Sequence, residues 1–288
     1  MAEQTLILGS ERHIVATLTP ATREGAAVPR CVAMLTNSGV IPRSGPHRMN
    51  VHLARRFAEM DIPSIRFDMS GLGDSRRSSG SLPVLQQWIA DTRSVMDAAQ
   101  SHFGCDRFFM VGFCSGAEVA HMVALEDPRM RAAVLWDLYA YPTLQSNLRT
   151  ALYKLQRAGL QKAASKLLAR ALPALRSLSQ AAQAKDRAAE VSQVPSLAEY
   201  ARRIQVLVDD GVELLVAYCG GEPEWFNHRG QFRSMFGNCD FFDKVTFNYL
   251  EISDHLITRR EAQQAFTNMV VEWLEQRVLG ASHPAALP

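Results

Sequence analysis

The sequence has little that would indicate a metal centre, a disulfide framework or a membrane span. Its five cysteines are an odd number, and none belongs to a CxxC pair or to a cysteine and histidine cluster at metal-ligand spacing. No apolar run reaches about 18 residues, and the opening MAEQTLILGSERH has no basic segment followed by an apolar one. We therefore expect free thiols, no metal, no cofactor and a soluble, cytoplasmic protein.

The chain also lacks a strong charge of either sign. It has 31 Lys and Arg against 29 Asp and Glu, a formal net charge of +2. This balance gives no electrostatic reason to expect a nucleic-acid partner or a membrane surface for the chain as a whole. A chain of 288 residues can bury one large core, so we expect one folding unit with room for an inserted subdomain.

What the sequence does have is an alternation of short apolar runs and helical patterns. Two short strands around a turn are predicted at residues 5–8 and 14–18. After them, strand patterns alternate with helix patterns. The predicted strands are residues 30–35, 62–69, 106–113 and 130–137, and the predicted helices are residues 47–60, 82–103 and 115–126. Repeated βαβ units predict an α/β fold, a mainly parallel sheet with helices on both faces.

The strand patterns stop between residues 141 and 205. Residues 148–190 are rich in Ala, Leu, Lys and Arg, which favours helix. Strand patterns return at 211–221 and 244–253, and an amphipathic helix follows at 258–279. We therefore predict a core formed by 1–140 and 206–288, with 141–205 as an inserted helical cap.

The segment GFCSG, residues 112–116, lies between a predicted strand and a predicted helix. A sharp turn of this kind, the nucleophile elbow, has no room for side chains two residues before and after the nucleophile, so glycines are needed there. The first N–H groups of the following helix would favour a thiolate at Cys114. The alternative is that Cys114 is an inert buried residue in a glycine-rich turn.

Nucleophilic catalysis at an elbow requires a base and an acid later in the chain. His255 follows the last predicted strand, where the base is expected, although seven other histidines are present. These are His13, His47, His52, His102, His121, His228 and His283. For the acid, Glu222 and Glu224 follow one strand and Asp137 follows another. We prefer a glutamate over Asp137, and sequence spacing does not distinguish Glu222 from Glu224.

Two backbone N–H groups are expected to form an oxyanion hole. One comes from the residue after the nucleophile, Ser115, and the other from the loop after the first buried parallel strand. Ser38 or Gly39 is the candidate in that loop.

Four segments together resemble the α/β-hydrolase superfamily, in particular its serine-aminopeptidase-like branch and the exosortase-system-associated hydrolases. They are NSGVIPRSGPHR (37–48), RFDMSGLGDS (66–75), GFCSGA (112–117) and SDHLITRREA (253–262). The resemblance implies an eight-stranded sheet, a lid after the sixth strand and a scaffolding role for Asp68. Most superfamily members have serine at the elbow, whereas this sequence has cysteine, as the dienelactone hydrolases that such an elbow resembles do.

These features predict a cysteine-dependent acyl-transfer enzyme that acts on a small-molecule ester or thioester. With water as acceptor it is a hydrolase or thioesterase, and with an alcohol or amine it is an acyltransferase. The alternative from another class is a non-catalytic binding protein that kept the hydrolase fold.

The predicted cap is basic and offers a second contact surface. Between residues 144 and 190 it has nine Lys or Arg against two acidic residues. An acyl carrier protein, a coenzyme A phosphate or an anionic lipid surface would each match that charge, although a solvated helical face is the simpler explanation. The oligomeric state has no signal in the sequence.

Overall fold

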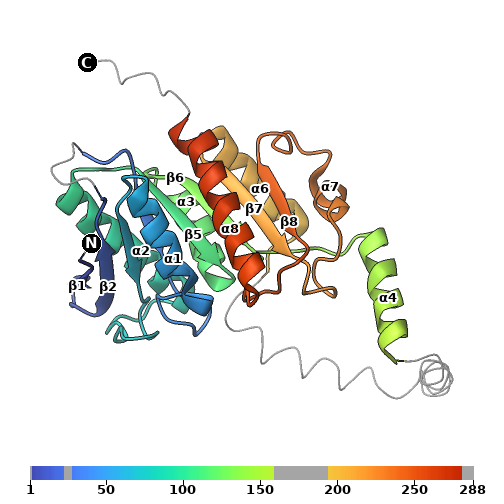
Figure 1. Cartoon of the computed structure of the whole chain (residues 1–288), viewed down its shortest axis with the longest axis horizontal. Helices are drawn as coiled ribbons and strands as arrows, with labels where there is room; N and C mark the ends of the chain where they lie inside the picture. Colours follow the sequence, from blue (N-terminus) through green and yellow to red (C-terminus); the bar gives the residue numbers. More distant parts are fainter. Residues whose placement is uncertain (1, 23–27, 159–193, 281–288) are drawn as a thin grey trace.

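The computed structural model describes residues 2–22, 28–158 and 194–280 (Figure 1). Its strands are β1 (Gln4–Leu8), β2 (Ile14–Thr19), β3 (Val32–Leu35), β4 (Ser64–Phe67), β5 (Phe108–Phe113), β6 (Met130–Trp136), β7 (Glu213–Cys219) and β8 (Thr246–Leu250). Its α-helices are α1 (Met49–Glu59), α2 (Val84–Phe103), α3 (Ser115–Glu126), α4 (Leu144–Ala158), α6 (Leu197–Asp209), α7 (Gly230–Phe236) and α8 (Arg260–Trp273). A 3₁₀ turn, η1 (Pro46–Arg48), precedes α1, and a π-helical segment, η2 (Leu274–Leu279), extends α8.

The eight strands form one sheet in the order β1-β2-β4-β3-β5-β6-β7-β8. β2 runs antiparallel to β1 and β4, and the remaining neighbours are parallel. The predicted N-terminal antiparallel pair and the parallel βαβ units are both confirmed. Because helices cover both faces, the central strands β3, β4 and β5 are buried throughout, and the sequences of β3 and β5 are nearly continuous apolar runs.

Two apolar layers hold the helices to the sheet. The alternation along β5 directs Phe108 and Met110 to one layer and Phe109 and Val111 to the other. The first layer packs against α2, α3 and α6, and the second against α1 and α8 (Figure 1). Strands β3, β5, β6 and β8 run in the same direction. The loops that follow them therefore all lie at one edge of the sheet, the edge formed by the carboxyl ends of the strands.

Helix α6 belongs to the core, although residues 197–205 fall inside the predicted cap. Tyr200, Ile204 and Leu207 are buried in the first apolar layer, and the helix contacts α3 and β7. Helical periodicity looks the same in a helix that covers a sheet and in one that forms a lid, which is why the boundary at 206 is too late. Most of the rest of the predicted cap, 159–193, lies outside the described residues, so the cap remains a prediction.

Helix α4 differs from α6 in its exposure. Leu144, Leu148 and Leu152 are at least half exposed, at 92%, 62% and 50%. The middle of the helix is held through Thr150, which donates to the Pro223 carbonyl and accepts from the Asn227 amide. Within the described ranges, no helix has the length and apolarity needed to cross a membrane.

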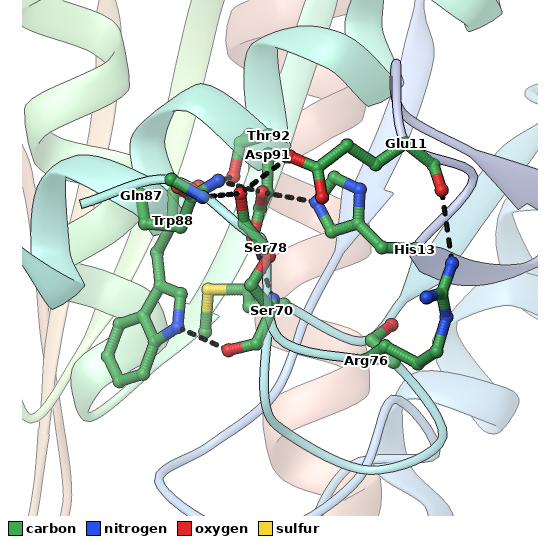
Figure 2. A network of polar contacts seen from close by, with 12 residues as sticks. Glu11, His13, Ser70, Arg76, Ser78, Gln87, Trp88, Asp91 and Thr92 are labelled. Carbon is green, nitrogen blue, oxygen red and sulfur yellow. Dashed lines mark hydrogen bonds and ion pairs between the residues drawn. The ribbon is translucent and has the colours of Figure 1, made fainter. Parts of the chain in front are cut away.

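A buried polar network fixes the loop that follows β4 (Figure 2). The Asp91 carboxylate on α2 contacts His13 Nε2 at 3.3 Å and accepts the Ser70 N–H at 2.7 Å and the Gln87 amide at 2.8 Å. The indole of Trp88 donates to the Ser70 carbonyl at 3.2 Å. Helix α2 therefore holds this loop through both backbone groups of Ser70.

Candidate active site

Cys114 occupies a strained turn between β5 and α3. Its φ of 52° and ψ of −117° lie outside the usual regions for a residue with a side chain. A Cβ on Gly112 would lie 2.4 Å from the Gly116 carbonyl oxygen, and a Cβ on Gly116 would lie 2.5 Å from that of Asn37. Both obstacles are backbone, so the glycines of GFCSG are a steric requirement. The Cys114 side chain is partly exposed.

His255 lies between a carboxylate and the Cys114 thiol. Its Nδ1 is 2.8 Å from Asp137 Oδ2, and its side chain is close enough to that of Cys114 for the two groups to interact. The hydrogen bond with Asp137, together with the interaction with Cys114, raises the pKa of His255 to about 10, although partial burial disfavours the charged ring. At neutral pH the ring is therefore an imidazolium.

Asp137 is fixed from three directions. It directly follows β6 and has a φ of 48°. Its N–H donates to the Ala217 carbonyl at 2.9 Å, and its Oδ1 accepts the Cys219 N–H at 2.8 Å. Only 3% of its side chain is exposed. These contacts leave Oδ2 for the imidazole, which fixes the orientation of the ring.

The loop of His255 packs tightly on its neighbours. The Trp136 indole donates to the His255 carbonyl at 3.0 Å. A Cβ on Gly220 would lie 2.4 Å from the Glu251 carbonyl oxygen, and one on Gly221 would lie 2.6 Å from Asp254 Cα. The double glycine after β7 thus allows the two loops to touch.

The structure reverses the order in which the acids were preferred. Asp137 contacts His255, whereas Glu224 forms an ion pair with Lys154 at 3.2 Å and its side chain is 59% exposed. In the described part of the chain, no hydrogen bond or ion pair joins Glu222 or Glu224 to His255. The reason is the close approach at Gly220 and Gly221, a contact between distant loops that sequence spacing does not show.

The expected oxyanion-hole residues lie at the same edge. The Gly39 N–H donates to Ser115 Oγ at 2.9 Å, which places Gly39 against the first residue of α3. The Ser38 N–H instead donates to the Ile41 carbonyl at 3.3 Å within a tight turn. As the first residue of α3, Ser115 has an N–H without an intrahelical acceptor. Gly39 and Ser115 are therefore better placed than Ser38.

A buried carboxylate holds the Gly39 loop, and two of its partners were not predicted. Asp68 Oδ1 accepts the Asn37 amide at 2.9 Å and the Arg43 N–H at 2.7 Å, and Oδ2 pairs with the Arg43 guanidinium at 2.5 Å. A Cβ on Gly73 would lie 2.3 Å from the same carboxyl group. Asp68 has the scaffolding place that the resemblance implied, but Asn37 and Arg43 had no distinguishing signal in the sequence.

Among the competing histidines, His121 is the most deeply buried. It is on α3, and burial lowers its pKa to about 3, so the ring is neutral. Its ring packs edge-on against Tyr200 at 5.4 Å. In the described ranges, no group of three or more His, Cys, Asp or Glu side chains is arranged to hold a metal ion.

Comparison with known proteins identifies the family. The profile described as Serine aminopeptidase, S33 matches residues 46–209, more than half of the chain. The chain belongs to this hydrolase family. The S33 match contains Cys114 and Asp137 and ends before His255. A comparison with curated protein sequences gave no match.

Solved structures give the same fold as the S33 assignment. Proline iminopeptidase from Mycobacterium smegmatis has a TM-score of 0.59 and 16% identity, covering 98% of this chain and 100% of its own. An α/β serine hydrolase without a lid from Xanthomonas campestris has a TM-score of 0.55 and 15% identity, covering 96% of this chain and 94% of its own. A meta-cleavage product hydrolase from Pseudomonas fluorescens IP01 has a TM-score of 0.56 and 16% identity, covering 95% of this chain and 97% of its own. At such identities the likeness establishes the α/β-hydrolase fold.

Proposed function

We propose that this protein is a cysteine-dependent hydrolase of esters or thioesters that works through Cys114, His255 and Asp137. One observation supports the proposal above all others: the His255 ring joins the Cys114 side chain to a buried carboxylate. The strained backbone of Cys114 adds support, because a structure keeps such strain only where surrounding contacts impose it. A buried structural cysteine would need neither feature.

The first half-reaction uses His255 as an acid. A thiolate is the nucleophilic form of cysteine, and a neighbouring imidazolium stabilises it. The Cys114 sulfur bonds to the substrate carbonyl carbon, and the electron pair moves to the carbonyl oxygen. The Ser115 N–H stabilises that oxyanion, and the Gly39 N–H joins it once it releases Ser115 Oγ. When the intermediate collapses, the bond to the leaving group breaks, and the imidazolium gives that group its proton.

The second half-reaction returns the proton. Neutral His255 takes a proton from water as the water oxygen bonds to the acyl carbon. Collapse then breaks the bond between carbon and sulfur, and it releases the carboxylic acid with the thiolate again beside the imidazolium. Ester or thioester plus water therefore gives acid plus alcohol or thiol, and Asp137 keeps its charge throughout.

Thioesters and activated esters are the substrates that best suit a sulfur nucleophile. The exosortase-associated branch, the cytoplasmic location and a carrier-protein or coenzyme A partner remain predictions from the sequence. Transfer to an alcohol or amine in place of water is the related alternative, and product analysis with added alcohol separates the two.

The test compares matched variants on a thioester and an activated ester. We expect C114A and H255A to lose about 10³-fold or more in kcat/KM, as triad removal does in other enzymes. C239A is the control, because Cys239 is also partly exposed but its pKa is raised by burial and by Asp240. Equal activity of C114A and the wild type would refute the proposal, and a wild type inactive on every ester and thioester would favour a binding protein.

A further inference from the structure

A groove runs between α1 and α8 on the sheet face opposite α2, α3 and α6. Its volume is about 480 Å³, the size of a small-molecule site, and α1 and α8 line it. Met49, a fully buried residue, is at its wall, and the rest of the lining is polar or charged. None of these lining residues belongs to the Cys114 site.

The lining carries more positive than negative charge. Three arginines line the groove: Arg55 and Arg56 from α1 and Arg260 from α8. Its one carboxylate, Glu59, is 2.7 Å from Arg56 and forms an ion pair with it. In the described part of the chain, no carboxylate forms an ion pair with Arg55 or Arg260. An anion entering the groove would therefore find guanidinium groups on both walls.

Two further side chains add hydrogen-bond donors beside the arginines. His52 lines the groove one turn before Arg55 and Arg56, and Asn268 faces them from α8. The Asn268 carboxamide oxygen accepts from Gln264 at 2.8 Å, so its own amide N–H groups are the part left to meet a ligand. The lining is thus rich in donors, and its one carboxylate is already paired.

We propose that the α1–α8 groove binds a small molecule carrying two or more phosphate groups. Arginine suits phosphate because its planar fork gives two parallel hydrogen bonds to one phosphate. Guanidinium groups on opposite walls favour a ligand with more than one anionic group. The volume fits a compound of nucleoside diphosphate size, and the near-neutral charge of the whole chain argues against a nucleic acid.

The groove site is separate from the proposed catalytic chemistry. Both helices begin at the carboxyl edge of the sheet, and Arg56 lies seven residues into α1 from Met49, which at 1.5 Å per residue is about 10 Å along the axis. Arg260 is the first residue of α8, near that edge, and Arg55 and Arg56 lie further along the sheet face, so the groove extends away from the edge that holds Cys114. Binding can therefore be measured in C114A as well as in the wild type.

Calorimetric titration of the full chain with ADP, pyrophosphate and citrate tests the site. We expect saturable binding of ADP and pyrophosphate with Kd on the order of 10⁻⁴ M, weakened by salt, and citrate binding at least about tenfold weaker. The double variant R55E/R260E should weaken ADP binding at least about tenfold. K244E is the control, because Lys244 is exposed and outside the lining and undergoes the same charge reversal.

Three results would overturn the proposal. They are absence of saturable ADP and pyrophosphate binding, citrate binding as tight as ADP binding, and equal loss in R55E/R260E and K244E. R55Q/R260Q, which removes charge without introducing repulsion, keeps the test valid if the reversed variant fails to fold. Because every readout is binding, these results are independent of whether Cys114 is catalytic.

Discussion

At the scale of single residues, the chemistry depends on how Asp137 and His255 set each other's state. Asp137 is the largest cause of the raised pKa of His255, ahead of Cys114. The buried Asp137 carboxylate can raise the pKa of His255 only if one of its two oxygens is left for the imidazole. In this protein Cys219 takes Oδ1 and His255 takes Oδ2.

The variant D137N tests this dependence. Replacing the carboxylate with an amide removes the charge and the strongest acceptor of His255, so its pKa should fall from about 10 by at least two units. NMR titration of the imidazole in both proteins measures the change.

E224Q is the matched control for D137N. It makes the same chemical change in another predicted acid, which pairs with Lys154, and should leave the titration of His255 as it is. An unaltered pKa of His255 in D137N would contradict the assignment of Asp137.

The residues of the site were only partly predictable from the sequence. Cys114 and His255 could be chosen because glycine sterics and chain order constrain where each can be. Asp137 could be named but not ranked first, since its selection depends on Gly220 and Gly221 packing against another loop. Asn37 and Arg43 contact Asp68 across segments that only the folded chain brings together.

At the scale of elements, two loops meet at the elbow, and glycine allows the contact. Gly116, in the first turn of α3, packs directly against the Asn37 carbonyl. The Gly39 loop is held in turn by Asp68, and the segment after Asp68 is held by α2 through Asp91. Helix α2 thus positions the segment after Asp68, and Asp68 in turn positions the Gly39 loop at the site.

G116A should disrupt this contact. Its Cβ would lie 2.5 Å from a backbone oxygen, so we expect a loss of about 3 kcal/mol or more in the free energy of unfolding. In G80A the nearest atom is Ser78 Oγ at 3.4 Å, and the change should be within about 0.5 kcal/mol. Urea denaturation measures both, and equal values would refute the steric account of the elbow.

D91N tests the support that α2 gives the loop after β4. The amide provides a weaker and less complete acceptor for the Ser70 N–H, Gln87 and His13, so we expect a loss of about 1–3 kcal/mol in the free energy of unfolding. D97N, on the same helix, removes an exposed ion pair with Arg129 and should cost under about 1 kcal/mol. A larger effect in D97N than in D91N would show that the network in Figure 2 does not stabilise the fold.

The elements themselves were largely predictable. Buried strands such as β5 are short runs of apolar residues, and helices such as α8 keep one apolar stripe at the helical period, so each type has a recognisable pattern. Helix α6 was assigned to the cap because its pattern does not say what it covers. The short helix α7 was not predicted, since seven residues hold less than two helical repeats of pattern.

At the scale of the whole molecule, the raised pKa of His255 makes stability depend on pH. The folded protein binds this proton more tightly than the unfolded chain does, whose histidine has the ordinary pKa of 6.5. The resulting stabilisation is complete below about pH 6.5 and is lost as pH rises through about 10.

We therefore expect the wild type to lose unfolding free energy relative to H255Q between pH 6.5 and 10. The difference between the two proteins isolates His255 from other groups that titrate in this range. Urea denaturation across that range measures it. A difference that is constant with pH would contradict the raised pKa.

The central claim is that the Cys114 sulfur becomes covalently bonded to the acyl group. Intact-mass analysis and peptide mapping of acid-quenched reactions with an activated thioester test it most directly. The account predicts one acyl group per chain, carried on Cys114 in the wild type and absent from C114A. Substrate turnover that persists in C114A, or an acyl group found only on another residue, would contradict it.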